Sequence, residues 1–244
     1  MMPRPTGKLI LPGIVAVLAV FGALAWVSGS SSDQPSTCFG SSARGALRDA
    51  WKLPRSGSNF RAYSGLGWLL GRTFVHSAVH QVLLESYRRL EAAHPEYRFV
   101  YGETGFEAGG PFEPHRTHQN GLSVDFMVPV RDASGGVAEL PTSAFRKFGY
   151  GLEFDDSGAW GELRIDFEAT ALHLAELKRS ASGRRVRITR VIFDPNLSAH
   201  LKRTRAWPQI RNLPFMTKPP WIRHDEHYHV DFETPCRPLG ALAK

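Results

Sequence analysis

Cysteine is scarce in this chain, and its scarcity limits the kinds of metal site that the protein can form. Only Cys38 and Cys236 occur among the 244 residues. Structural zinc sites favour close cysteine pairs such as C-x₂-C, which two distant cysteines do not provide. A chain of this length also buries a full hydrophobic core without help from a metal. A metal bound by other side chains would therefore serve chemistry rather than folding.

Motifs of several common enzymes are missing as well. The sequence has no G-x-S-x-G elbow, which argues against a serine nucleophile. His76 and His80 have the spacing of the two ligands in H-E-x-x-H, but Ser77 stands where that motif needs its glutamate. We therefore do not take these two histidines as metal ligands.

Acidic side chains are outnumbered by basic ones, and the formal charge is +7. A basic protein suits an anionic partner such as a wall polymer, a membrane surface or nucleic acid, although the charge also suits simple solubility. No nucleic-acid-binding motif is present. We therefore expect no nucleic-acid partner.

Charged residues are absent from one long stretch near the N-terminus. Arg4 and Lys8 precede an apolar run from Leu9 to Val27, and small polar residues follow up to Ser32. This is the layout of a secretory signal peptide or of an uncleaved signal-anchor, and the run is long enough to cross a bilayer. A buried N-terminal helix of a cytoplasmic protein is the alternative interpretation.

The leader divides the chain into two parts. Residues 1–32 are expected to be a signal peptide or signal-anchor with its linker, and residues 33–244 a single exported domain. Contact with a membrane is expected only through an uncleaved anchor. An exported domain meets an oxidising compartment, where Cys38 and Cys236 can form a disulfide that ties its two ends together.

The rest of the sequence mixes helix and strand patterns without a strict βαβ rhythm. Apolar residues at helical spacing predict one helix over 73–93 and another over 166–178. We interpret residues 28–72 as an irregular arm and residues 205–223 as a loop. A short helix is predicted over 195–202, and alternating residues predict strands over 98–101, 122–130, 185–193 and 227–233. The expected fold class is α+β, with a small antiparallel sheet flanked by helices.

Histidine is concentrated at two places. Of the ten histidines, five lie within residues 115–125 and 224–231. His227 and His229 share one face of the last predicted strand, since side chains two residues apart do so. Asp125 lies on the polar face of an earlier strand, and His118 precedes that strand. Buried imidazoles and carboxylates need partners, and a bound cation would supply one.

Three protein ligands and a water are typical of a catalytic zinc site. His118, Asp125 and one of the two histidines on the last strand would supply the ligands. His227 and His224 then lie within reach for the base and the oxyanion donor that hydrolysis needs. A solvated polar surface or a structural hydrogen-bond cluster is the alternative interpretation.

The motifs around these residues resemble those of a known family. The runs are Gly102-Glu103-Thr104-Gly105, Gly109-Gly110-Pro111-Phe112, His115-x-x-His118-Gln119-x-Gly121-Leu122-x-Val124-Asp125 and His224-Asp225-x-His227-Tyr228-His229-Val230. They resemble the penicillin-insensitive murein endopeptidases, which belong to a wider group with lysostaphin, D-Ala-D-Ala metallopeptidases and sonic hedgehog. The resemblance covers about residues 72–236 and is dense only in these motifs.

The resemblance implies a fold like that of hedgehog and the D-Ala-D-Ala peptidases, and a periplasmic enzyme, released or anchored to the inner membrane. It implies one Zn²⁺ per chain, held by His118, Asp125 and His229. His115, His224 and His227 would line the site, with His227 or His224 as the base or the transition-state stabiliser. The implied reaction is hydrolysis of D-alanyl–diaminopimelate cross-links in peptidoglycan. A disulfide between the terminal cysteines is also expected.

The sequence departs from the family pattern at one position near the site. Ser123 stands where relatives usually carry aspartate, on the same strand face as Asp125, so substrate contacts are expected to differ. Two other functions remain open. One is a zinc D,D- or L,D-carboxypeptidase that trims wall peptides, and the other is a non-catalytic wall-binding module.

Overall fold

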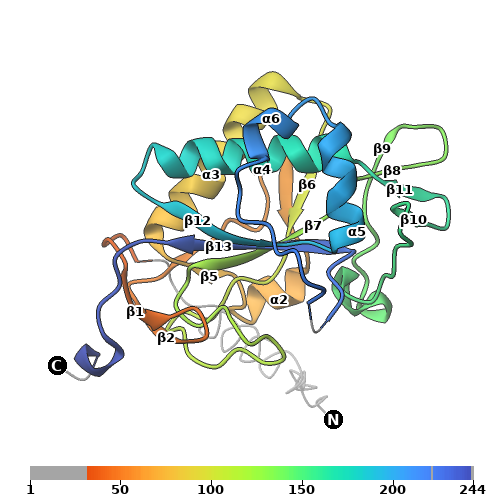
Figure 1. The fold of residues 1–244 in the computed structure, drawn as a ribbon. Helices are drawn as coiled ribbons and strands as arrows, with labels where there is room; N and C mark the ends of the chain where they lie inside the picture. Colours follow the sequence, from red (N-terminus) through yellow and green to blue (C-terminus); the bar gives the residue numbers. More distant parts are fainter. Residues whose placement is uncertain (1–31, 221, 243–244) are drawn as a thin grey trace, which may run out of the picture.

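The computed structural model describes residues 32–220 and 222–242 (Figure 1). The predicted leader falls outside these residues except for Ser32, so the leader and the domain boundary after it stay predictions. None of the helices in the described part of the chain has the length and apolar character needed to cross a bilayer.

A five-stranded sheet forms the centre of the molecule, and the four strands predicted from alternation all belong to it. Neighbouring strands are antiparallel except for one parallel pair, β4 and β6. The α+β prediction is therefore confirmed, with one parallel pair in an otherwise antiparallel sheet. The strand order is β12 (Arg187–Ile192), β13 (His227–Glu233), β7 (Ser123–Met127), β6 (Phe99–Tyr101) and β4 (Phe60–Ala62).

Two long helices, α3 (Ser77–Ala93) and α4 (Phe167–Ser182), cover one face of this sheet (Figure 1). Asp166 begins α4 by accepting a hydrogen bond from the Ala169 amide. On β13, Tyr228 contacts His173 of α4 through its hydroxyl, so every second residue from Tyr228 faces the helices and is buried in the core. The alternate residues of β13, which include its two histidines, face the other way.

The predicted helix over 73–93 begins later than expected. Phe74 and Val75 form the short strand β5 (Phe74–Val75), which pairs with β3 (Trp51–Lys52). The α3 helix starts after His76, whose Nδ1 accepts a hydrogen bond from the Ala78 amide at 3.1 Å. Histidine is not among the side chains that usually mark a helix start. The sequence therefore contained no signal for this boundary.

The prediction of an irregular arm over residues 28–72 is wrong for much of its described part. β1 (Thr37–Ser41) and β2 (Arg44–Arg48) form a hairpin, α2 (Gly65–Leu69) is a short helix, and β4 completes the central sheet. The arm prediction was based on the glycine, serine and arginine content of the segment, which does not exclude short strands and helices.

Other short elements surround the central sheet. Residues 205–223, predicted as a loop, contain the short helix α6 (Trp207–Ile210), while the helix predicted over 195–202 is present as α5 (Pro195–Ser198) and the 3₁₀ helix η2 (Ala199–Arg203). Two further 3₁₀ helices are η1 (Ala144–Gly149) and η3 (Leu239–Ala241). A four-stranded sheet at one side comprises β10 (Ala159–Trp160), β11 (Leu163–Ile165), β8 (Val130–Arg131) and β9 (Val137–Ala138) (Figure 1).

The predicted disulfide between Cys38 and Cys236 is confirmed. It joins β1 to the segment that follows β13, where the Gly40 amide also donates a hydrogen bond to the Arg237 carbonyl at 2.9 Å. The bond spans 198 residues of sequence. In the chain-entropy model, closing so long a loop stabilises the folded state by about 5 kcal/mol.

Candidate metal centre

The register between β7 and β13 brings the two histidine-rich segments together. His229 lies opposite Asp125, and Asp231 lies opposite Ser123. Residues directly opposite each other in an antiparallel pair share a face, with Cβ atoms about 5 Å apart. His229 Nδ1 accordingly lies 2.8 Å from Asp125 Oδ1, although 104 residues separate the two in sequence.

His118 reaches the same carboxylate from the loop before β7. Its backbone has a φ of 69°, in the left-handed region that non-glycine residues rarely adopt. Its Nε2 lies 3.3 Å from Asp125 Oδ1. The ring is fully buried, and neither nitrogen has a hydrogen-bond partner among the described residues. A buried polar atom without a partner costs about 1–3 kcal/mol, which a bound cation would offset.

The distance between His118 and Asp125 fits a small cation. Ligand atoms about 2.0–2.1 Å from a tetrahedral zinc lie about 3.3 Å from one another, which matches the 3.3 Å between His118 Nε2 and Asp125 Oδ1. His115, His118 and Asp125 also present ligand atoms that all lie within 4.8 Å of one another. Imidazoles and a carboxylate are a donor set that zinc accepts. The cluster can therefore hold a metal ion.

The two oxygens of Asp125 face different groups of side chains. Oδ1 faces His118 at 3.3 Å and His229 at 2.8 Å. Oδ2 accepts a hydrogen bond from the Tyr150 hydroxyl at 3.0 Å, with His115 Nδ1 at 3.8 Å and His227 Nε2 at 4.0 Å. An ion at Oδ1 would thus meet His118 and His229, while His115 and His227 stand on the other side of the carboxylate.

The protonation states of Asp125 and His118 agree with a metal site built around a carboxylate. Burial alone would raise the pKa of Asp125, but His118 and His227 together with the hydrogen bonds hold that pKa well below its usual range. Burial dominates at His118 and lowers its pKa, so its ring is neutral and keeps a lone pair for a metal.

A cleft of about 1070 Å³ opens above these residues. The four histidines His115, His224, His227 and His229 line it, whereas His118 and Asp125 are fully buried beneath. Lys147 and Phe148 come from η1, and the segment from Phe215 to Pro220 supplies another part of the lining. The predicted catalytic histidines therefore share one cleft, with the most buried pair under its floor.

A model of a known protein family matches this sequence. The model of the penicillin-insensitive murein endopeptidases matches residues 38–239, which is most of the chain. The chain belongs to this family of murein endopeptidases. It is therefore an enzyme that hydrolyses peptidoglycan, as the motif resemblance implied. No curated protein matches the chain.

In this murein endopeptidase, two of the cleft histidines are each oriented by a glutamate. His115 Nε2 lies 2.6 Å from Glu103 Oε2, and His227 Nδ1 lies 2.9 Å from Glu226 Oε1. Because carboxylates only accept hydrogen bonds, the bonded nitrogen of each ring carries a proton and the other nitrogen is left free. Glu226 occupies the unspecified position of the motif His224-Asp225-x-His227, and no role was predicted for it.

Glu103 holds His115 and Tyr150 holds Asp125, and of the two only Glu103 belongs to a motif quoted above. Glu103 follows β6 and also binds Arg72 and the Tyr63 hydroxyl, the latter at 2.7 Å. Burial would raise the pKa of Glu103, but His115 and Arg72 lower it to about 2. The Tyr150 hydroxyl accepts the Glu103 amide at 2.8 Å while it donates to Asp125. Tyr150 follows η1, so only the folded chain shows its role.

A third group holds the far side of His229. Asp231 Oδ1 lies 3.0 Å from His229 Nε2, which must donate because the carboxylate only accepts. The other nitrogen, Nδ1, therefore faces Asp125. Ser123 Oγ and Arg190 Nε hold Asp231 at 2.5 Å and 2.6 Å. Ser123, where the resemblance implied a departure from the family pattern, is thus a buried donor to Asp231, and this contact was not predicted.

Proposed function

We propose that the chain is a zinc metalloendopeptidase that hydrolyses D-alanyl–diaminopimelate cross-links in peptidoglycan. One Zn²⁺ per chain would be held by His118, Asp125 and His229. The observation that carries this proposal is Asp125 Oδ1, which the other two side chains both approach within 3.3 Å. The partnerless nitrogens of His118 support it further. A zinc ion supplies the Lewis acidity that activates water toward an amide carbonyl.

His227 is proposed as the group that moves the proton. Its Nδ1 is occupied by Glu226, so Nε2 is the nitrogen free to accept a proton and to return it to the leaving amine. Burial alone would lower the pKa of His227, but Glu226 and Asp125 raise it. The protonated ring would then also stabilise the negative charge on the tetrahedral intermediate.

His115 and His224 are proposed as supporting groups in the cleft. His115, held by Glu103, keeps its Nδ1 on the same side of Asp125 as His227. The ring of His224 packs on His227 with a centroid distance of 4.5 Å. Burial, followed by the charge of His227, lowers the pKa of His224 to about 4, so it would be a weaker base than His227. His224 is therefore assigned to positioning His227.

The proposal includes export to the periplasm. The uncharged run from Leu9 to Val27 supports it, as does the disulfide, since such bonds persist mainly in oxidising compartments. The leader would be removed or would remain as an inner-membrane anchor. Cell fractionation followed by mass analysis of the mature protein tests both outcomes. Finding the full chain in the cytoplasm with free thiols would contradict export.

The reaction is tested by digesting peptidoglycan sacculi with the purified protein. Soluble uncrosslinked monomers should appear, release should stop on adding a chelator, and Zn²⁺ should restore it. His229→Ala should show no release. Release that continues at full rate in the chelator would overturn the zinc mechanism.

The products also separate the alternative functions. A carboxypeptidase would release free D-alanine and leave cross-links intact, and a wall-binding module would bind sacculi without releasing soluble products. Amine groups of diaminopimelate that become free during the digest would identify the D-alanyl–diaminopimelate bond as the one cut.

A further inference from the structure

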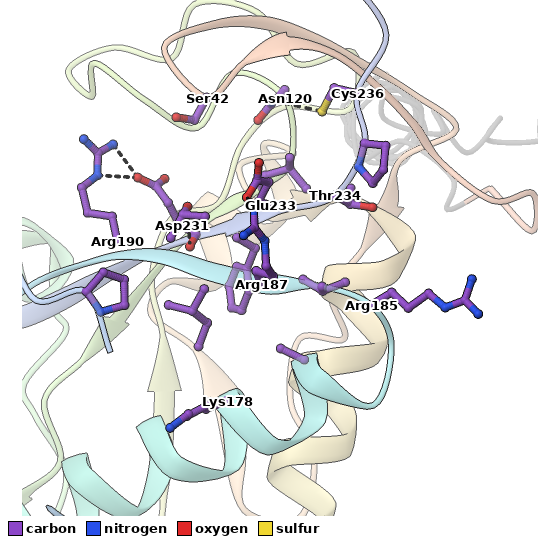
Figure 2. Close-up of a pocket in the computed structure, with 18 of the residues that line it drawn as sticks. Ser42, Asn120, Lys178, Arg185, Arg187, Arg190, Asp231, Glu233, Thr234 and Cys236 are labelled. Carbon is purple, nitrogen blue, oxygen red and sulfur yellow. Dashed lines mark hydrogen bonds and ion pairs between the residues drawn. The ribbon is translucent and has the colours of Figure 1, made fainter. Parts of the chain in front are cut away.

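A second hollow lies beside the catalytic cleft and has no role in the function described so far. It is a groove of about 1180 Å³ at the ends of β12 and β13. Figure 2 shows Ser42, Asn120 and Cys236 on one side of it, facing the strand residues Asp231 and Glu233. Ser42 lies in the turn of the β1–β2 hairpin, so the hairpin and the edge of the sheet enclose the groove.

The groove adjoins the cleft and extends around the edge strand β12, where Lys178 of α4 also lines it. Arg190 lines both hollows, and Ser42 lines the groove while the next residue, Ala43, lines the cleft. His229, Asp231 and Glu233 alternate along β13 and so share one face. At about 3.3 Å per residue, Glu233 lies about 13 Å along the strand from His229. A substrate that extends past the catalytic centre in this direction enters the groove.

Basic side chains at the far end of the groove are available to bind an anion. Among the described residues, Arg187 forms an ion pair only with Glu233, and both side chains are largely exposed, at 76% and 49%. Such surface pairs contribute little and exchange readily for another carboxylate. Arg185 has a φ of 57°, projects outward in Figure 2 and makes no ion pair with any described residue. Arg190, by contrast, is held by the buried Asp231.

The substrate carries carboxylates that the groove arginines can bind. Diaminopimelate carries two carboxyl groups, and a peptide stem ends in another, so cross-linked stems present carboxylates on both sides of the bond that is cut. Paired arginines are well suited to carboxylates because the guanidinium presents a fork of N–H donors.

We propose that this groove is a secondary substrate site, in which Arg185 and Arg187 bind carboxylates of peptidoglycan stem peptides near Glu233, which lies about 13 Å along β13 from His229. The substrate class rests on the proposed function. The site would hold the polymer in place and would not take part in bond cleavage. Loss of the site should therefore weaken the binding of large substrates and leave the rate of the chemical step unchanged.

The test compares two double variants with the same loss of charge. Arg185→Gln with Arg187→Gln removes the groove arginines. Arg184→Gln with Arg88→Gln removes two exposed arginines that do not line the groove. Binding to sacculi is measured by co-sedimentation of full-length protein in chelator, so that the measurement does not depend on hydrolysis. Unfolding midpoints of both variants confirm that they fold.

The groove variant should bind sacculi roughly five- to tenfold more weakly than the wild type, and the control variant should lose less than twofold. Sacculi whose carboxyl groups have been amidated should bind the wild type and the groove variant equally. On a short soluble cross-linked dimer, kcat of the groove variant should stay within about twofold of wild type.

Equal binding by the groove and control variants would overturn the proposal, as would a groove variant that loses kcat on the short dimer. Failure of the zinc endopeptidase proposal gives a different result. In that case sacculi are not cut by any form of the protein, while the binding difference between the two variants remains.

Discussion

His229 lies on one face of β13 and His173 packs from α4 against the other face, and the two rings are almost equally buried but differ in their charge. The exposed fractions of His229 and His173 are 2% and 1%. His229 lies between Asp125 and Asp231, and although burial alone would lower its pKa, these carboxylates raise it to about 9. His173, on α4, touches the Tyr228 hydroxyl, and burial lowers its pKa to about 3.

The comparison shows that burial does not distinguish a site histidine from a packing histidine, whereas the partners do. Aromatic rings surround His173, namely Tyr87, Phe99, Phe126 and Tyr228. Neutral surroundings favour the uncharged ring, which then fills space like another aromatic side chain. Carboxylates on both nitrogens favour a proton or a metal ion instead. The partners on the two sides of β13 thus keep His173 neutral and favour a proton or a metal ion at His229.

The strongest test of this contrast is His118→Ala compared with His173→Ala. His118→Ala should lower the rate of cross-link release at least about a thousandfold, because a metal ligand is lost. His173→Ala should retain zinc binding but lose about 3 kcal/mol of stability, since it removes a packed ring from the core. Release assays and urea unfolding in chelator measure the two effects. An active His118→Ala protein would contradict the metal site.

Asp231→Asn tests whether the second carboxylate prepares His229 for a metal. The substitution keeps the shape but removes the charge that fixes Nε2 as the donor and Nδ1 as the free nitrogen. We expect the affinity for Zn²⁺ to fall about 10- to 100-fold, as measured by competition with a chromophoric chelator. Asp166→Asn is the matched control, because Asp166 is also buried and paired with an arginine but lies at the start of α4. If Asp231→Asn binds Zn²⁺ as tightly as the wild type, Asp231 does not contribute to the metal site.

Much of this contrast was visible in the sequence, because it depends on strand spacing. β13 is present over the predicted residues 227–233, since strict alternation of polar and apolar side chains spans the whole strand. The same spacing placed His227 and His229 on one face with Asp125 nearby. His173 lies outside both histidine-rich segments, in the helix predicted over 166–178, and no site was predicted there.

Other parts of the site depend on contacts that no local pattern encodes. Tyr150 reaches Asp125 only because η1 folds over the cleft, and Arg190 reaches Asp231 only because β12 pairs with β13. The strand β4 was missed for a similar reason, since three residues become a strand only beside β6. Sequence spacing thus predicts what one element presents, and the packing of elements decides what that element meets.

Lowering the pH should reduce the stability of the folded protein because of His173, the histidine in the core. The pKa of His173 is about 3 in the folded protein, against an ordinary value of 6.5. Because the folded state resists protonation, stability is unaffected above pH 6.5 and falls as the pH drops below that value. At pH 5.5 the loss from this group is about 1.4 kcal/mol.

Urea unfolding in chelator at neutral pH and at pH 5.5 measures this loss. His173→Phe is the control, because a phenyl ring fills the space but does not titrate. The difference in stability between wild type and variant should shrink or reverse on acidification. A difference that is constant with pH would show that His173 does not cause the acid sensitivity.

The smallest expected effect comes from Ser123→Ala. The Ser123 hydroxyl is fully buried and donates to Asp231 at 2.5 Å. Without it, Asp231 keeps Arg190 and His229 as partners, so the metal site should weaken only about two- to fivefold in zinc affinity. The loss of stability should be about 1 kcal/mol.

Ser86→Ala provides the matched control for this change. Ser86 is also fully buried, but its hydroxyl donates to the Leu83 carbonyl within α3, away from the metal centre. Both variants should lose similar stability, and only Ser123→Ala should lose zinc affinity. If the two variants bind zinc equally well, the hydroxyl of Ser123 only satisfies a buried carboxylate, and Arg190 alone is enough to hold Asp231 against His229.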